Sequence, residues 1–99
     1  MLLNELRFEW DEEKNEINKR KHGISFETAI HIFEDENRIE IYDREHSIDE
    51  DRYNTIGLVK NVIFVVYTER GEAIRMISAR PASALERSLY YGQAHDFDT

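Results

Sequence analysis

Residues 52–79, RYNTIGLVKNVIFVVYTERGEAIRMISA, predict most of the sheet of this protein. The middle of this stretch, residues 62–67, is apolar throughout, which predicts a central strand buried on both faces. Residues 52–59 and 73–79 have the composition of strands on either side, and Lys60–Asn61 is a predicted tight turn. Consecutive strands joined by short turns pair antiparallel, so we expect a largely antiparallel sheet.

The segment before these strands predicts one strand and two helices. Residues 6–10 alternate between apolar and polar, as in a half-buried strand. Asp11 is a favourable N-cap for a helix over 12–22, and Gly23 is placed to end it. Ser25 is the predicted N-cap of a second helix, in which Phe26, Ala29, Ile30 and Phe33 lie three and four positions apart, which indicates one buried face.

The segment after the strands predicts a closing helix over 82–91. Pro81 suits the first position of such a helix, which leaves Arg80 at or near the N-cap. Leu85 and Leu89 lie one helical turn apart and are the predicted apolar anchors.

These elements give an α+β domain with the order β-α-α-β-β-β-α, in which a mainly antiparallel sheet packs against helices. Residues 38–43 alternate in polarity as well, and 43–51 is a predicted acidic loop. The expected domain covers residues 1–91, and 92–99 is expected to be a flexible tail.

The composition restricts the class of protein. The chain has 99 residues, of which 34% are charged and 40% hydrophobic, which is typical of one small globular domain. It has no cysteine, which excludes disulfides and thiolate chemistry. It shows neither a signal peptide nor an apolar run of about 18 residues, so we expect a cytoplasmic protein without a membrane segment.

The charge is unevenly distributed. The formal net charge is −8, which by itself argues against a nucleic-acid ligand. Much of the acidic excess lies in residues 34–52, so a basic surface elsewhere remains compatible with the composition. The simpler alternative is that the charges only keep a small protein soluble.

The helix over 12–22 is unusually polar. Ile17 is its one large aliphatic residue, and Lys14, Asn18 and Lys21 lie on the same stripe. Such a helix is either held by polar contacts to its neighbours or presents its polar face to a ligand.

His22 ends this helix and is either a surface residue or a proton-transfer group. The four histidines follow no known metal-ligand spacing, so we expect no metal site and no cofactor. The chain also has no glycine-rich phosphate loop, no nucleophile elbow and no HExxH helix.

Two arginines lie on the last predicted strand. Strict alternation places Arg75 with Ile77 on one face, and Arg80 with Met76 and Ser78 on the other. Each arginine is either salt-bridged across the sheet or part of a phosphate clamp, because guanidinium groups match phosphate geometry. Glu86 and Tyr90 are spaced to join such a clamp or to flank the leucines of the closing helix.

Two runs are specific together: W-D-x-x-K-x-x-x-N-x-x-K-H-G-I-x-F in residues 10–26 and I-S-A-R in residues 77–80. They are accompanied by Phe8, Glu9, Glu27, Ala29, Phe33, Glu34, Asp35, Asp51, Arg52, Ile56, Gly57, Ile74, Arg75, Met76, Glu86 and Tyr90. In order and spacing these residues resemble the BrnT family, the toxins of type II toxin–antitoxin pairs. The resemblance covers residues 7–91.

The resemblance implies a RelE-like ribonuclease fold and an endoribonuclease that arrests growth. It further implies neutralisation by a BrnA-like antitoxin with a ribbon-helix-helix DNA-binding domain. The complex would bind operator DNA only through the antitoxin, and the toxin would form a homodimer within it.

Cleavage of RNA without a metal needs a base for the 2′-OH, an acid for the 5′-oxygen, and cations for the developing charge. The predicted catalytic residues are Lys14, Lys21, His22, Glu27, Arg75 and Arg80, and the predicted RNA contacts are Arg52 and Tyr90. Within this set Arg75 and Arg80 are expected on the phosphate, and His22 or Glu27 as base or acid. The alternative is a non-catalytic toxin-fold module that serves only as antitoxin partner and co-repressor.

Overall fold

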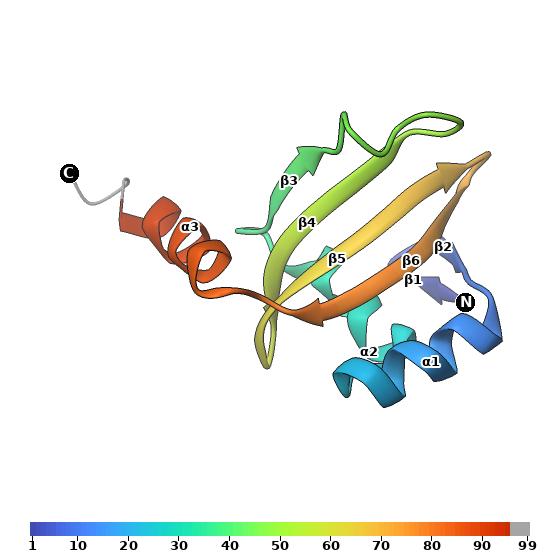
Figure 1. Ribbon diagram of the computed structural model, residues 1–99, viewed down its shortest axis with the longest axis horizontal. Coiled ribbons are helices and arrows are strands. Elements are labelled where there is room, and N and C mark those ends of the chain that lie inside the picture. Colours follow the sequence, from blue (N-terminus) through green and yellow to red (C-terminus); the bar gives the residue numbers. More distant parts are fainter. Residues whose placement is uncertain (96–99) are drawn as a thin grey trace.

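The computed structural model describes residues 1–95, which form a mixed α+β fold around one six-stranded sheet (Figure 1). The strands are β1 (Leu2–Leu3), β2 (Leu6–Glu9), β3 (Ile39–Tyr42), β4 (Arg52–Val59), β5 (Asn61–Arg70) and β6 (Ala73–Pro81). The helices are α1 (Glu12–His22), α2 (Phe26–Ala29) and α3 (Ala84–His95), with a 3₁₀ helix η1 (Ile30–Glu34) after α2. None of these helices is long and apolar enough to cross a membrane.

The sheet has the order β1-β2-β6-β5-β4-β3, and all neighbours pair antiparallel except β2 and β6. The α+β class is therefore confirmed, but the predicted order lacks two strands. The alternating segment at 38–43 forms β3, and Leu2–Leu3 forms β1.

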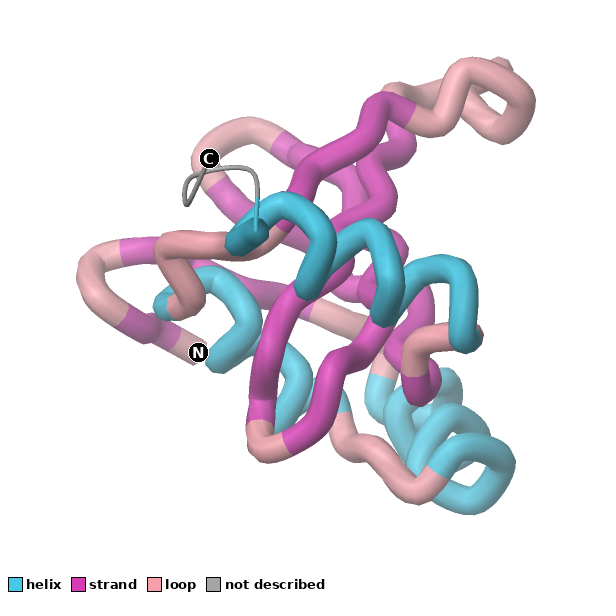
Figure 2. The backbone as a smooth tube through the Cα atoms, turned by 90° about the vertical axis from the view of Figure 1, so that its left-hand side faces the viewer, coloured by secondary structure: helices cyan, strands magenta, loops and turns pink. Residues whose placement is uncertain are grey.

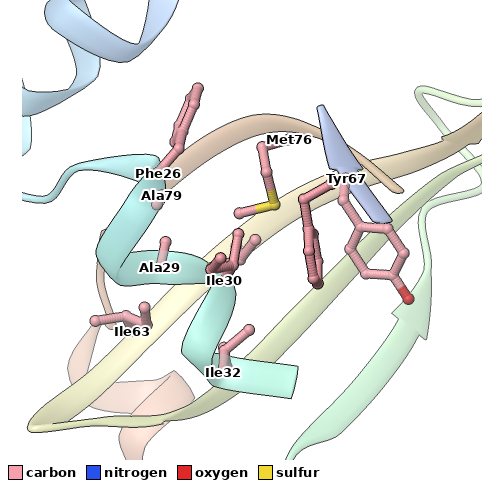
Figure 3. Close-up of a cluster of buried hydrophobic side chains, with 10 residues drawn as sticks. Phe26, Ala29, Ile30, Ile32, Ile63, Tyr67, Met76 and Ala79 are labelled. Atoms are coloured by element: carbon pink, nitrogen blue, oxygen red, sulfur yellow. The ribbon is translucent and has the colours of Figure 1, made fainter. Parts of the chain in front are cut away.

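The main core lies between one face of the sheet and the α2–η1 segment (Figure 3). Ser25 caps the second helix as predicted, but the helix changes to 3₁₀ geometry at Ile30. The fully buried side chains of this core include Phe26, Ala29, Ile30, Ile32, Val65 and Ala79. We call the side of the sheet that α2 and η1 cover the helix face. The opposite side, which carries Arg52, Arg75 and Arg80, is called the arginine face.

Helix α1 confirms the predicted bounds, with Asp11 as N-cap and Gly23 in the left-handed region at φ 73°. Polar contacts hold it in place of an apolar stripe. Asn18 Nδ2 donates to the Ala79 carbonyl at 2.8 Å, and the Ala79 N–H donates back to Asn18 Oδ1 at 3.1 Å. Asn15 Oδ1 accepts from the Phe26 N–H at 2.8 Å. The two buried asparagines thus attach α1 to β6 and α2.

A β-bulge in β6 overturns the expectation that the two arginines of this strand lie on opposite faces. Val66 of β5 pairs with Ser78, but Tyr67 pairs with Met76, so Ile77 is an extra residue without a partner. The extra residue shifts the alternation by one position.

As a result, Arg75 lies opposite Thr68 and Arg80 opposite Phe64. These two β5 positions are four residues apart and therefore point to the same side of the sheet. That side is the arginine face, because Tyr67 and Met76 point into the core on the helix face.

The start of α3 differs from the prediction, because Arg80 and Pro81 still belong to β6. Ser83 precedes the helix and forms a capping box with Glu86 instead. Ser83 Oγ accepts from the Glu86 N–H at 3.2 Å, and Glu86 Oε1 accepts from the Ser83 N–H at 2.7 Å.

The buried side of α3 also differs from the prediction. Leu85 and Leu89 are 71% and 50% exposed, so they are not its anchors. Tyr90 is buried instead, against Ile56 and Val62 at one end of the arginine face. In Figure 2, seen from this end, α3 lies in front of the strands, and it contacts β4 and β5. The predicted tail at 92–99 is helical as far as His95, and 96–99 lie outside the described residues.

Candidate functional site

Arg75 lies on the arginine face beside the parallel strand β2. Its Nη1 forms an ion pair with Glu9 Oε2 at 2.9 Å, and the two residues are register partners. The Arg75 side chain is 25% exposed and that of Glu9 41%. The pair is thus at the surface, where an arginine keeps further N–H donors for a ligand.

Arg80 is held more tightly, at the junction of β6 and α3. Its two terminal nitrogens donate to the two carboxylate oxygens of Glu86, each at 2.8 Å. The guanidinium also lies 4.1 Å from the centre of the Phe64 ring. The hydrogen bond from Arg80 lowers the pKa of Glu86, so both partners stay charged at neutral pH.

Arg52, predicted as an RNA contact, shares this face. It lies opposite Thr68 on β5, which in turn lies opposite Arg75 on β6. Two strand spacings place the Arg52 and Arg75 backbones about 10 Å apart. Within residues 1–95, Arg52 has no ion pair.

Two further arginines, which we did not predict, extend the arginine face. Arg7 of β2 and Arg70 of β5 are the two register partners of Ala73, one row beyond Arg75. Arg70 pairs with Glu50 at 3.4 Å. Arg7 and Arg70 lie close together because β6 pairs with both β2 and β5. No pattern of neighbouring residues in the sequence predicts that strand order.

His22 lies on a different surface, at a pocket with a volume of about 620 Å³. The end of α1, the β4–β5 turn, the end of β6 and one side of α3 form its walls. The polar or aromatic side chains of the lining are those of His22, Thr28, Lys60, Asn61, Arg87 and Tyr91. No carboxylate belongs to this lining.

The predicted residues Lys14 and Lys21 are exposed on α1, two helical turns apart on the same side. Neither has an ion pair within residues 1–95, and α1 packs on β6 at Ala79 of the helix face, whereas Arg75 and Arg80 lie on the arginine face. The two lysines are cations available to a ligand but are not part of a preformed cluster.

Glu27 and Tyr90 are both engaged in contacts within the fold. Glu27 accepts a hydrogen bond from Asn15 Nδ2 at 2.7 Å, which lowers the pKa of its carboxyl. Tyr90 is buried and donates to Asp35 Oδ2 at 2.6 Å. Burial and this hydrogen bond raise the pKa of Tyr90 to about 12, so it stays protonated.

The structure therefore separates the predicted residues: Lys14 and Lys21 are exposed on α1, Glu27 and Tyr90 make contacts within the fold, and the other four lie on two surfaces. Arg52, Arg75 and Arg80 share the arginine face, whereas His22 lies at the pocket. Within residues 1–95, no group of three or more histidine, aspartate and glutamate side chains is arranged to hold a metal ion. The cationic side chains of both surfaces can bind anions, and an imidazole such as that of His22 is able to transfer a proton.

The pocket residues Lys60, Asn61, Arg87 and Tyr91 were missed by the sequence analysis. Lys60 and Asn61 were assigned only to a turn, and Arg87 and Tyr91 only to a helix. Their common position depends on where α3 crosses the sheet, which no local pattern specifies.

Comparison with known proteins gives two matches. A family model described as "Ribonuclease toxin, BrnT, of type II toxin-antitoxin system" matches residues 10–86. The crystal structure of the Brucella abortus ribonuclease toxin, BrnT, is similar with a TM-score of 0.61 and 28% sequence identity. That match covers 79% of this chain and 97% of the Brucella chain. No curated protein sequence matches at a significant level.

Proposed function

Since this chain belongs to the BrnT family of type II ribonuclease toxins, we propose that it is an endoribonuclease that cleaves RNA without a metal ion. The 2′-OH of one nucleotide attacks the adjacent phosphorus while a base removes its proton. The bond from phosphorus to the 5′-oxygen breaks, and an acid protonates the leaving oxygen. The products are a 2′,3′-cyclic phosphate and a free 5′-OH.

The observation that supports this proposal is the bulge at Ile77, which brings Arg75 and Arg80 to the face that also bears Arg52. Arginine side chains match phosphate groups geometrically and stabilise the extra charge of the transition state. Glu9 and Glu86 orient two of them, so these guanidinium groups need little rearrangement when RNA binds.

The proton transfers are assigned to His22 or Glu27, and Lys14 and Lys21 are assigned as further cations. His22 is not on the arginine face, and the link between them is Arg80, whose neighbour Pro81 lines the same pocket as His22. Histidine suits proton transfer because it exchanges protons near neutral pH. Glu27 is the weaker candidate, since the hydrogen bond from Asn15 lowers its pKa and reduces its basicity. Tyr90 was predicted as an RNA contact, but its hydroxyl donates to Asp35. Any role at the RNA site is therefore to position neighbouring residues and not to contact RNA through this hydroxyl.

The type II family implies an antitoxin partner. We further propose that this partner is BrnA-like, with a ribbon-helix-helix domain that binds operator DNA, and that the free toxin arrests growth in the cytoplasm. The RelE-like character of the fold is part of the same proposal. A homodimer within the complex is supported by the exposed leucines of α3, Leu85 and Leu89.

The test is cleavage of purified RNA in the presence of EDTA. We expect wild-type protein to cut, and Arg75→Ala or Arg80→Ala to slow cleavage by about 100-fold, as for the loss of one transition-state contact. Arg52→Ala is included because it removes no ion pair and should stay folded. Arg44→Ala, at an exposed position of the acidic loop, is the control and should cut like wild type.

If the folded wild-type protein cuts no RNA, or if all three arginine variants cut as fast as Arg44→Ala, the proposed site is wrong. Folding is checked by circular dichroism and by binding of the antitoxin.

A second candidate function is the non-catalytic partner and co-repressor. It is favoured by the pairing of Arg75 and Arg80 with carboxylates, which neutralises two of the three arginines. It predicts that wild-type protein expressed alone neither slows growth nor cuts RNA, yet still binds the antitoxin.

A further inference from the structure

We propose that the pocket between α1, the β4–β5 turn and α3 binds one nucleotide of an RNA strand, with its phosphate on Lys60 and Arg87 and its base on Tyr91. The inference rests on the proposed function, because it takes the ligand to be RNA. It assigns a second contact region, separate from the arginines of the sheet.

The charge of the pocket differs from that of the molecule. The chain has 21 acidic residues and a net charge of −8, yet the pocket lining has no carboxylate and contains Lys60, Arg87 and His22. In a chain so rich in acids, such a lining concentrates positive potential, and a concave wall strengthens it. The ligand class that fits is an anion.

The backbone at Lys60 supports a role for its side chain. Lys60 has φ 65°, in the left-handed region that glycine adopts readily and asparagine tolerates better than most residues. A lysine here is conformationally unfavourable, and its ammonium group has no ion pair within residues 1–95. The Lys60 ammonium group is therefore available to an anion in the pocket.

Tyr91 provides an aromatic surface next to these cations. It is 51% exposed, and its ring meets that of the buried Tyr90 edge-on, with centroids 5.3 Å apart and planes at 78°. Tyr90 thus helps to fix the Tyr91 ring, which leaves area free for stacking. Aromatic rings beside cationic groups are the usual composition of sites for single-stranded nucleic acid.

The size and position of the pocket agree with this ligand. A volume of about 620 Å³ lies within the range of small-ligand sites. Pro81 lines the pocket and directly follows Arg80, and Arg87 directly follows Glu86. The Arg80–Glu86 pair thus connects the two surfaces, and a strand that contacts Arg80 can continue into the pocket.

The test measures binding separately from cleavage. The probe is a short fluorescent RNA oligonucleotide with 2′-O-methyl groups, which cannot be cut because the 2′-OH is blocked. Affinity is measured by fluorescence anisotropy at several salt concentrations. The variants are Lys60→Asn, Arg87→Ala and Tyr91→Leu, and Arg20→Ala, an exposed helical arginine outside both surfaces, is the matched control.

We expect Lys60→Asn and Arg87→Ala each to weaken binding several-fold and to reduce the slope of log K against log salt by about 0.7, the value for one phosphate contact. Tyr91→Leu should weaken binding about tenfold through lost stacking. Lys60→Asn should not lower the melting temperature, since asparagine tolerates the positive φ better. Arg20→Ala should bind like wild type.

Binding of Lys60→Asn and Arg87→Ala at wild-type strength overturns the inference even if the protein cuts RNA. The absence of any binding of the probe to wild-type protein overturns it as well. Conversely, if the variants bind more weakly but wild-type protein cuts no natural RNA, the proposed function fails and the nucleotide pocket stands.

Discussion

Arg80 joins three partners of different chemistry and so connects the last strand to the last helix. Its guanidinium donates to Glu86 and to the Pro81 carbonyl, and it lies over the Phe64 ring. A fork-to-fork contact with a carboxylate fixes both side chains in orientation as well as in distance. The same ion pair thus stabilises α3 and orients the Arg80 side chain, a candidate for binding phosphate.

The Arg80–Glu86 pair should make stability depend on pH in the acidic range. Because the pKa of Glu86 is lowered from 4.5 in the folded state, its contribution is present above pH 4.5 and is lost as the pH falls below that value. Glu86→Gln should therefore unfold more easily than wild type at pH 7, by about 1–2 kcal/mol, and this difference should shrink at pH 3.

Urea unfolding of both proteins at the two pH values measures this effect. Glu36→Gln, which changes an exposed carboxyl, is the control and should match wild type at both. A difference between Glu86→Gln and wild type that is equal at pH 7 and pH 3 would contradict the assignment.

At the scale of elements, α1 shows that a helix can be anchored by amide side chains rather than by an apolar stripe. The side-chain amide of Asn18 hydrogen-bonds to both the N–H and the carbonyl of Ala79 in β6. It makes the two bonds that the backbone of a neighbouring strand would make there. It also donates to the Ile24 carbonyl at 2.8 Å and so fixes the turn after the helix. This turn directly follows His22, which lines the pocket.

This arrangement predicts that, in α1, loss of a polar side chain destabilises the protein more than loss of the one large aliphatic side chain. Asn18→Ala should destabilise the protein by about 3 kcal/mol, because it leaves buried backbone groups without partners. Ile17→Ala should change stability by about 0.5 kcal/mol or less, because Ile17 is 47% exposed and alanine favours the helix.

Chemical denaturation of the two variants beside wild type measures both changes. A larger loss for Ile17→Ala than for Asn18→Ala would show that burial of Ile17, and not the asparagine, holds the helix.

At the scale of the whole molecule, α3 covers one end of the arginine face with Tyr90 and turns Leu85 and Leu89 outward. Two exposed leucines one helical turn apart form a small apolar surface of the kind that a second protein copy can bury. Away from α3, Thr68 between Arg52 and Arg75 is buried, and the Arg75 side chain is 25% exposed. The orientation of this one helix therefore sets both the pocket wall and the proposed contact between copies.

The double substitution Leu85→Ser and Leu89→Ser should halve the number of toxin copies in the purified complex with the antitoxin. Light scattering gives the mass of that complex. Leu2→Ser, which changes a leucine that is 69% exposed on β1, is the control and should leave the mass unchanged. An unchanged mass for the double variant would place the dimer contact elsewhere.

The sequence alone determined the features that depend on neighbouring residues. The bounds of α1 follow from Asp11 and Gly23, whose capping hydrogen bonds lie within the helix and its ends. The strands over 52–59 and 62–67 follow from their apolar content, and the family follows from the spacing of short motifs.

Which residues come together depends on tertiary packing. The bulge at Ile77 reverses the side on which Arg80 lies, and a bulge depends on how two strands pair rather than on either strand alone. Likewise, Lys60 and Arg87 line one pocket because α3 crosses the sheet beside the β4–β5 turn. Local patterns fix which elements form, whereas register and the packing of distant segments fix the faces on which their side chains gather.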